Sequence, residues 1–287
     1  MLELSLTNLA NLHGTDKGTL VGNKHAYSCI YDIIFRGWRN QPVNLMEIGL
    51  NIGGPELGYQ PDRQVTGAPS LSMWLDYFPS GKIHGVDISD FSMYQNDRFD
   101  FYRADCGNVD DLKKVAQDAP ACDFIIDDGS HASYHQQLTL LSLFPALKEG
   151  GFYIIEDLHW QPDDYECTLP SVPLTKKLLT TLVETGDIGD TGSIGRKEWE
   201  TVLSQIENIF LVDHRTLVHL GRFSNKGEGL DDDYPKTYDR VKLLSVGHLK
   251  AIIKKAGEFL ISLAGNTRPL RRPLVKLAVI QKKVGAG

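Results

Sequence analysis

Short apolar runs alternate with amphipathic stretches over most of the chain between residues 43 and 160. The runs are nearly continuous in apolar character, which is typical of parallel strands that are buried on both faces. They lie at 43–50, 82–88, 99–105, 124–127 and 152–155. The stretches that place apolar residues at helical spacing lie at 71–78, 109–117 and 134–144. This order predicts an α/β fold with a doubly wound, mostly parallel, Rossmann-like sheet and right-handed crossovers.

The chain on either side of this region has a different pattern. Helices are expected at 174–184 and 197–207, and 209–222 resembles two β segments that turn at Asp213, an antiparallel edge pair. Beyond residue 224 the chain becomes polar and then basic, and 248–265 predicts a basic amphipathic helix. The predicted divisions are an N-terminal helical segment at 1–40 that covers a cofactor site, a sheet domain at 41–223 and a basic helical C-terminal appendage at 224–287.

Composition and charge narrow the class of protein. The 287 residues carry a net charge of −7, which argues against a nucleic-acid partner. No apolar run is long enough to span a membrane, and the N-terminus lacks the pattern of a secretory signal. The four cysteines form no C-x-x-C pair, which favours reduced thiols in a cytoplasmic protein. For the basic tail we favour packing on its own domain or on a dimer mate over contact with a membrane surface.

Two acidic clusters follow the last two predicted parallel strands. The first is F-I-I-D-D-G-S-H, with Asp127 and Asp128, and the second is F-Y-I-I-E-D-L-H, with Glu156 and Asp157. Open α/β sheets bind their ligands at the carboxyl ends of the strands, so these carboxylates are expected to converge. A bound cation would relieve their repulsion, and oxygen ligands favour Mg²⁺ or a similar ion.

A glycine-bearing turn after the first strand indicates a second ligand. Its pattern, E-x-G-x-x-x-G-G from Glu47, departs from the G-x-G-x-x-G of pyrophosphate-binding turns. Acids that end the next two strands, Asp87 and Asp105, are placed to meet a ribose and an adenine amino group. Such a set suits S-adenosylmethionine, although each glycine alone also fits a simple turn and each aspartate a helix cap. The residues predicted to contact this cofactor are Glu47, Gly49, Gly53, Gly54, Asp87, Ser89, Asp105 and Asp127, with Thr15, Lys17 and Tyr27 from the N-terminal segment.

The chain resembles the Mg²⁺- and S-adenosylmethionine-dependent sugar O-methyltransferases, which have the class I methyltransferase fold. The resemblance covers roughly residues 8–223 and rests on motifs that occur in order: H-G-T-D-K-G, M-E-I-G, M-W-x-x-Y-F-P, G-V-D-I, I-I-D-D-G-S-H, L-F-P-x-L-K-x-G-G and I-I-E-D-L-H. It implies that Asp128, Glu156 and Asp157 bind Mg²⁺, which chelates the acceptor hydroxyls, and that His131 is the general base. It also implies a sugar-containing acceptor and a homo-oligomer. Two features depart from the family, the loop at 55–69 and the basic tail.

Three other hypotheses stay open at the level of sequence. The same metal chemistry serves methylation of a catechol-like diol, although the polar loop after Glu156 suits a carbohydrate better. The chain could instead be a non-catalytic adenosine-cofactor-binding module of a biosynthetic complex. A nucleotide-sugar enzyme that handles phosphate is the third hypothesis, and the acid in the first strand argues against it. Binding of S-adenosylmethionine but not of NAD would separate these hypotheses.

Overall fold

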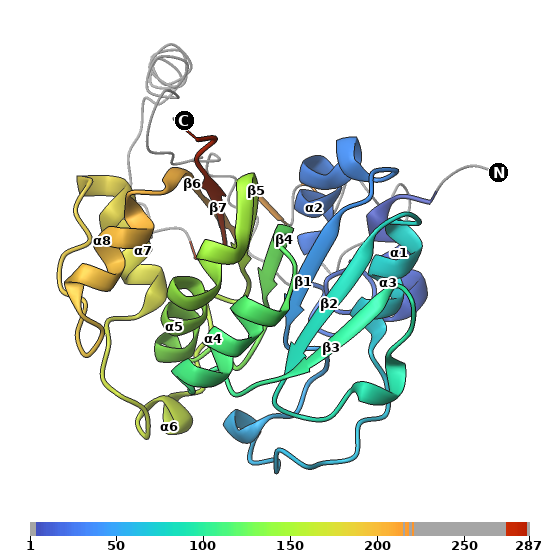
Figure 1. Ribbon diagram of the computed structural model, residues 1–287, viewed down its shortest axis with the longest axis horizontal. Helices are drawn as coiled ribbons and strands as arrows, with labels where there is room; N and C mark the ends of the chain where they lie inside the picture. Colours follow the sequence, from blue (N-terminus) through green and yellow to red (C-terminus); the bar gives the residue numbers. More distant parts are fainter. Residues whose placement is uncertain (1–3, 215, 218–219, 221–273, 286–287) are drawn as a thin grey trace, which may run out of the picture.

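A seven-stranded mixed sheet forms the centre of the protein (Figure 1). The computed structural model describes residues 4–214, 216–217, 220 and 274–285. The strands are β1 (Asn44–Ile48), β2 (Lys82–Asp87), β3 (Phe99–Arg103), β4 (Cys122–Asp127), β5 (Leu147–Ile155), β6 (Ile206–Asp213) and β7 (Val275–Lys282). Their order is β3-β2-β1-β4-β5-β7-β6, and β7 is antiparallel to both of its neighbours. The predicted doubly wound Rossmann-like sheet with an antiparallel edge pair is confirmed.

Helices cover both faces of the sheet (Figure 1). They are α1 (Leu6–His13), α2 (Tyr27–Phe35), α3 (Pro69–Tyr77), α4 (Val109–Asp118), α5 (Ser133–Leu143), α6 (Asp163–Glu166), α7 (Thr175–Thr185) and α8 (Arg196–Leu203), with 3-10 turns at Arg36–Trp38, Pro55–Leu57, Ser92–Tyr94 and Phe144–Ala146. Alternate side chains of a strand point to opposite faces, so β1 sends Leu45 toward α1, α2 and α3 and Met46 toward the other helices. Two apolar cores result, one on each face of the sheet.

The chain reverses its direction across the sheet between β1 and β4. From β1 it proceeds outward to β2 and β3, and it then returns to place β4 on the other side of β1. The two strand ends are tied by backbone hydrogen bonds, from Asp128 N to Ile48 O at 2.9 Å and from Gly49 N to Val86 O at 2.8 Å. A reversal of this kind opens a crevice at the carboxyl ends of the strands. The glycine turn and the first acidic cluster both lie there.

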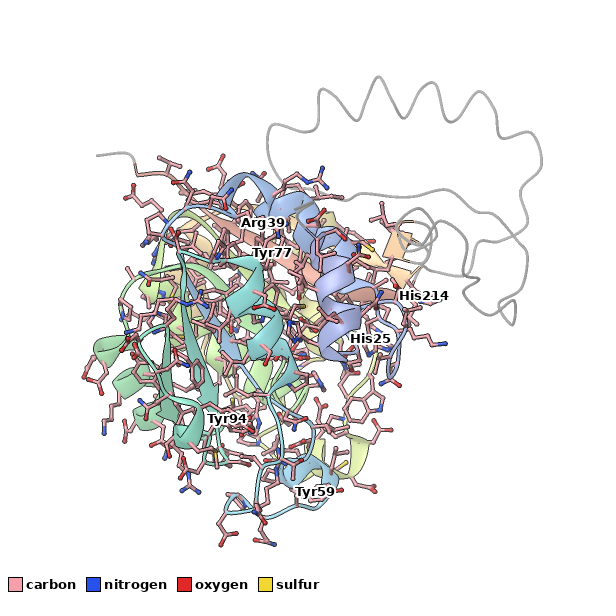
Figure 2. All side chains as sticks on the ribbon, turned by 90° about the vertical axis from the view of Figure 1, so that its right-hand side faces the viewer. His25, Arg39, Tyr59, Tyr77, Tyr94 and His214 are labelled. Atoms are coloured by element: carbon pink, nitrogen blue, oxygen red, sulfur yellow. The ribbon has the colours of Figure 1, made fainter. Side chains whose placement is uncertain are left out.

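The helices on the N-terminal side are fixed by polar contacts around Asp32. Its carboxylate accepts hydrogen bonds from the backbone amide of Leu6 and from the Tyr77 hydroxyl, at 3.4 and 3.2 Å. The guanidinium of Arg39 lies 4.7 Å from the centre of the Tyr77 ring, and Figure 2 shows these two side chains together. These contacts join α1, α2 and α3. They therefore set the position of α2, which carries Tyr27 over the sheet.

Residues 275–282 form a strand within the sheet, which corrects the expectation that they belong to a helical appendage. Val275–Lys282 was included in the appendage, but it forms β7 between β5 and β6 and buries the run from Leu277 to Ile280. The partner of β6 is therefore β7 and not residues 214–222, of which the described positions 214, 216–217 and 220 are helical. A short apolar run does not distinguish helix from strand by its periodicity. The apolar run at 277–280 is only four residues long and has lysines on both sides, so the strand was not recognised.

The remaining predictions concern three helices, a membrane span and the cysteines. The helices expected at 174–184 and 197–207 correspond to α7 and α8, and α8 ends earlier, at Leu203. The basic helix expected at 248–265 lies outside the described residues. Within the described ranges no helix combines the length and the apolar character that a membrane crossing needs. All four cysteines are free thiols, as their spacing predicts.

Candidate active site

A cavity of about 800 Å³ opens at the carboxyl ends of the parallel strands. One part of its wall comes from the loop between α1 and α2, which contributes Thr15, Lys17 and His25. The other parts come from the turns after β1 to β5 and from the loop at 55–69, with further side chains from α5, α6 and β7. This is the position at which open α/β sheets bind ligands. The size is that of a pocket for a small molecule.

Asp128, His131 and Asp157 converge on this cavity from two strand ends. Nε2 of His131 lies 3.7 Å from Oδ2 of Asp157 and 4.0 Å from Oδ1 of Asp128. The three ligand atoms lie close enough to hold one metal ion. His131 and Asp157 also have left-handed backbone conformations, with φ of 60° and 51°. Such conformations are costly for residues other than glycine, and they are concentrated at functional sites.

Glu156 lies behind these groups and does not line the cavity. Both of its carboxylate oxygens are 3.0 Å from Nζ of Lys17, and the Tyr31 hydroxyl donates a hydrogen bond to Oε1. The same ammonium pairs with Asp128 and lies 3.6 Å from Glu47. One buried cation thus serves three carboxylates. Of the three metal ligands that the family resemblance implies, the structure brings Asp128 and Asp157 to the cavity and engages Glu156 with Lys17.

Helix α2 orients both acids of the second cluster. The Tyr27 hydroxyl donates to Oδ1 of Asp157 at 2.5 Å, and Tyr31 donates to Glu156. The two tyrosines are four residues apart, so they lie on the same face of the helix. β5 ends at Ile155, and the chain turns at Asp157. This turn allows two neighbouring acids to point in different directions, Glu156 into the protein and Asp157 into the cavity.

Burial controls the electrostatics of the cluster. It raises the pKa of Asp128, and it raises the pKa of Glu156 well above the usual range with help from the charge of Asp128. Burial alone would also raise the pKa of Asp157, but His131, His25 and the Tyr27 hydroxyl outweigh it and the pKa is lowered. Burial alone would lower the pKa of Lys17, but the charges of its acidic neighbours, Asp128 and Glu156 first, raise it. At Asp128 and Glu156 the effect of burial thus outweighs the charge of Lys17, and the neutral carboxyl form is favoured.

The glycine turn after β1 shapes the cofactor side of the cavity. Gly49 has φ of 83°, and a side chain there would collide with the backbone carbonyl of Asp128. The Asp87 carboxylate accepts hydrogen bonds from the backbone amides of Leu50 and Ser89, at 2.9 and 2.8 Å. Asp105 accepts from the backbone amide of Gly107 at 2.7 Å. Both aspartates line the cavity, and each also organises its own turn.

The predicted site residues divide into two groups. Those that line the cavity are Thr15, Lys17, Gly49, Gly53, Gly54, Asp87, Asp105, Asp128, His131 and Asp157. Those buried away from it are Glu47, Ser89, Tyr27, Asp127 and Glu156. Asp127 points into the protein, where the Tyr153 hydroxyl at 3.0 Å and the Thr139 hydroxyl donate to it, and burial raises its pKa to about 6. Adjacent strand residues face opposite sides, so only Asp128 of this pair reaches the cavity.

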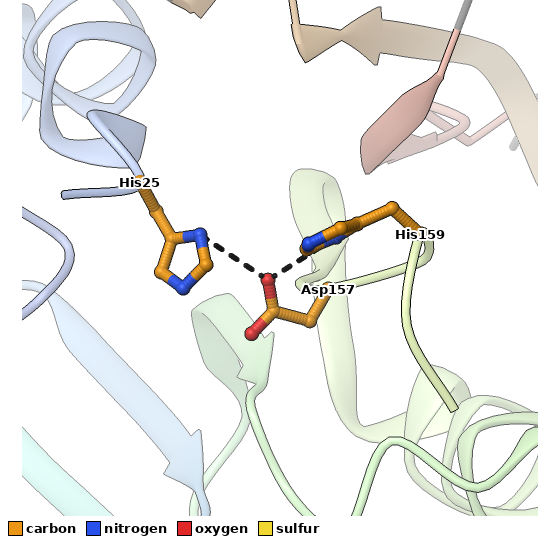
Figure 3. Close-up of side chains that lie close together, drawn as sticks. All are labelled: His25, Asp157 and His159. Carbon is orange, nitrogen blue, oxygen red and sulfur yellow. Dashed lines mark ion pairs between the residues drawn. The ribbon is translucent and has the colours of Figure 1, made fainter. Parts of the chain in front are cut away.

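Figure 3 shows a second group around Asp157. Oδ1 of Asp157 lies 3.6 Å from Nδ1 of His25 and 3.5 Å from Nδ1 of His159. Burial lowers the pKa of both histidines, that of His159 to about 4. Nζ of Lys276, on β7, lies 2.6 Å from Nδ1 of His25.

Sequence reasoning missed Tyr31 and Lys276. Tyr31 had a signal, because a tyrosine four residues after Tyr27 shares its helix face. Lys276 also had one, since it is a lone charge in an apolar run. The position of Lys276 in the cavity wall could not be predicted without knowing where β7 lies in the sheet.

The fold and the site together define a class of protein. The sheet, with antiparallel β7 between β5 and β6, has the Rossmann-like fold of S-adenosylmethionine-dependent methyltransferases. The cavity lies at the carboxyl ends of its parallel strands. The MycE methyltransferase of the mycinamycin pathway, solved in complex with Mg, SAH and mycinamycin VI, superimposes with a TM-score of 0.54 at 30% identity. That match covers 74% of this chain and 53% of the other.

Two curated relatives agree with this structural match. The 8-demethyl-8-(2-methoxy-alpha-L-rhamnosyl)-tetracenomycin-C 3'-O-methyltransferase of Streptomyces olivaceus is 40% identical over 154 residues, which are 53% of this chain and 36% of that protein. The mycinamicin VI 2''-O-methyltransferase of Micromonospora griseorubida is 34% identical over 185 residues, 62% of this chain and 44% of that protein. The expected resemblance to sugar O-methyltransferases is thereby confirmed. The chain spans less than half the length of these two relatives, and no family model matches it.

Proposed function

We propose that this chain is a Mg²⁺-dependent O-methyltransferase that transfers a methyl group from S-adenosylmethionine to a sugar hydroxyl of a glycosylated natural product. The observation that carries the proposal is the convergence of Asp128, His131 and Asp157 on a cavity beside the Gly49 turn. The similar proteins are named as methyltransferases of a rhamnosyl tetracenomycin and of mycinamicin VI, which supports the class of acceptor. A homodimer and a cytoplasmic location stay predictions.

The residues present fit a hard divalent cation. Asp128 and Asp157 offer oxygen donors to the cavity. Glu156 would have to turn from Lys17 toward the cavity to become a third ligand. Lys17 is shared among three buried acids, so a bound cation would favour the ionised forms of these acids. When bound, Mg²⁺ would lower the pKa of two neighbouring sugar hydroxyls by Lewis acidity, and S-adenosylmethionine would supply the methyl group.

The residues of the chain would position the acceptor and accept its proton. As the methyl group passes from sulfur to the acceptor oxygen, the hydroxyl proton passes to Nε2 of His131. Asp157 and Asp128, at 3.7 and 4.0 Å, stabilise the imidazolium that forms. Lys17, Tyr27 and Tyr31 hold the acids in place, and the Gly49 turn with Asp87 shapes the cofactor side. The leaving group of methyl transfer is already good, so catalysis consists mainly of alignment and deprotonation.

The test is methyl transfer from labelled S-adenosylmethionine to a panel of acceptors. The panel contains rhamnosylated and other deoxysugar-bearing polyketides, free rhamnose and a catechol, each with Mg²⁺ and with EDTA. We expect methylated glycoside in the Mg²⁺ arm alone. Methylation of the catechol in preference to every glycoside would instead favour the diol hypothesis. Binding of S-adenosylmethionine with no turnover on any acceptor would favour a non-catalytic module.

A further inference from the structure

The carboxylate of Asp157 faces a different set of side chains with each oxygen. Oδ2 lies 3.7 Å from Nε2 of His131, on the side of Asp128. Oδ1 lies 3.6 Å from Nδ1 of His25 and 3.5 Å from Nδ1 of His159 (Figure 3). Each set holds three ligand atoms close together. One carboxylate thus separates two positions at which a cation can be held.

The Oδ1 side has the geometry of a transition-metal site. Metal–ligand bonds of about 2.0–2.1 Å at tetrahedral angles place neighbouring ligand atoms about 3.3–3.4 Å apart. The observed separations of 3.5 and 3.6 Å are within a few tenths of an ångström of that value. Two imidazoles with one carboxylate favour Zn²⁺, Fe²⁺ or Co²⁺ over Mg²⁺. Nδ1 of His159 is buried and has no hydrogen-bond partner among the residues that the structure describes.

An ammonium group already engages one ligand atom of this set. Nζ of Lys276 is 2.6 Å from Nδ1 of His25 and 5.4 Å from the centre of the Tyr27 ring. Its backbone is held by β7, and its carbonyl accepts a hydrogen bond from the amide of Leu158 at 3.0 Å. The side chain is buried, so it has little freedom to withdraw. A metal ion and this ammonium cannot share the one lone pair of Nδ1.

We propose that Lys276 is a metal-selectivity residue, whose ammonium caps Nδ1 of His25 and so keeps transition-metal ions out of the position between His25, Asp157 and His159. The divalent ion is thereby confined to the Asp128 side of Asp157. The inference rests on the proposed function for the ion on that side. It adds that the protein contains a latent transition-metal site, which is closed by a residue from the last strand.

The test measures Co²⁺ binding to the full chain by equilibrium dialysis and by visible absorption. Lys276→Met removes the ammonium and keeps the length of the side chain. We expect this variant to bind one more Co²⁺ than the wild type does at the same metal concentration. Its affinity for Co²⁺ at the site formed by His25, Asp157 and His159 should be about 10- to 100-fold higher than that of the wild type. A new absorption band of nitrogen-coordinated Co²⁺ should appear with this binding. The double variant Lys276→Met/His159→Ala should lose the additional Co²⁺ and the new absorption band. Lys148→Met, which removes a lysine paired with Asp123 elsewhere, should behave as the wild type.

Two results would overturn the inference. One is a folded Lys276→Met variant that binds no additional Co²⁺, and Lys276→Gln provides the same comparison should the methionine variant fail to fold. The other is a wild type that already shows the nitrogen-coordinated band and loses it in His159→Ala. Neither result involves methyl transfer or Mg²⁺. Failure of the proposed function would appear separately, as absence of Mg²⁺ binding to the wild type by calorimetry.

Discussion

Nζ of Lys17 lies 3.0 Å from both carboxylate oxygens of Glu156, although 139 residues separate the two in the chain. Both side chains are almost completely buried, at 1% exposed for each residue. This pair joins the loop after α1 to the end of β5. It therefore fixes the N-terminal segment over the same strand end that presents Asp157 to the cavity.

Replacing Lys17 should destabilise the fold strongly. Lys17→Met would leave Glu156, Glu47 and Asp128 buried without their cation, and removing one partner of a buried ion pair costs about 3–5 kcal/mol. The measurement is the free energy of unfolding by urea. Lys148→Met is the matched control, because its pair with Asp123 is partly exposed and should contribute less than about 1 kcal/mol. Equal losses in the two variants would contradict the role assigned to Lys17.

Replacing Tyr27 should weaken catalysis more than stability. Tyr27→Phe removes the hydroxyl that orients Asp157, and losing such an outer contact to a metal ligand typically costs about 10- to 100-fold in metal affinity or activity. We expect this loss in kcat, with the dissociation constant of S-adenosylmethionine unchanged by calorimetry. Tyr77→Phe removes a comparable hydroxyl that contacts Asp32 instead. A similar loss of activity in that control would indicate a general structural effect.

Replacing His131 should remove the base. His131→Gln keeps a polar side chain of similar length, and loss of a positioned general base lowers rates by about 10²–10⁴-fold. The rate should fall while S-adenosylmethionine and Mg²⁺ still bind, as measured by calorimetry. A pH–rate profile adds a second check, because the acidic limb that reports the base should disappear. An unchanged rate with an unchanged profile would exclude His131 from proton transfer.

The buried imidazole of His84 should make stability depend on pH. Burial on β2 lowers its pKa to about 4, whereas the unfolded chain has the ordinary value near 6.5. Between these values the unfolded state binds the extra proton, so the stability present above pH 6.5 is lost as the pH falls toward 4. Comparing pH 7 with pH 4.5, the wild type should lose about 2 kcal/mol more than His84→Gln. Parallel losses in urea titrations of the two proteins would contradict this assignment.

The alternation of strands and helices between residues 43 and 160 could be predicted because parallel strands buried on both faces have nearly continuous apolar runs. The acids and glycines at the strand ends followed from the same pattern, since topology places all carboxyl ends at one edge. The position of β7 could not be obtained in this way. Its insertion between β5 and β6 is a long-range pairing, and no local pattern at 275–282 specifies its neighbours.

Side-chain direction was the other feature that sequence left open. Glu156 and Asp157 are adjacent, and only the turn at Asp157 decides that the first is buried against Lys17 while the second faces the cavity. The alternation rule for strands allows only one of Asp127 and Asp128 to face the cavity and does not say which. The hydroxyls of Thr139 and Tyr153 decide the outcome, because they accommodate Asp127 inside the protein.

The most direct test of the metal mechanism compares methyl transfer with cofactor binding in Asp128→Asn. This change removes one charge from the proposed metal ligands and keeps the shape of the side chain. We predict Mg²⁺-dependent methylation of a glycoside by the wild type, loss of that turnover in the variant, and the same dissociation constant for S-adenosylmethionine in both. Turnover that survives in the variant and is indifferent to EDTA would contradict the metal mechanism.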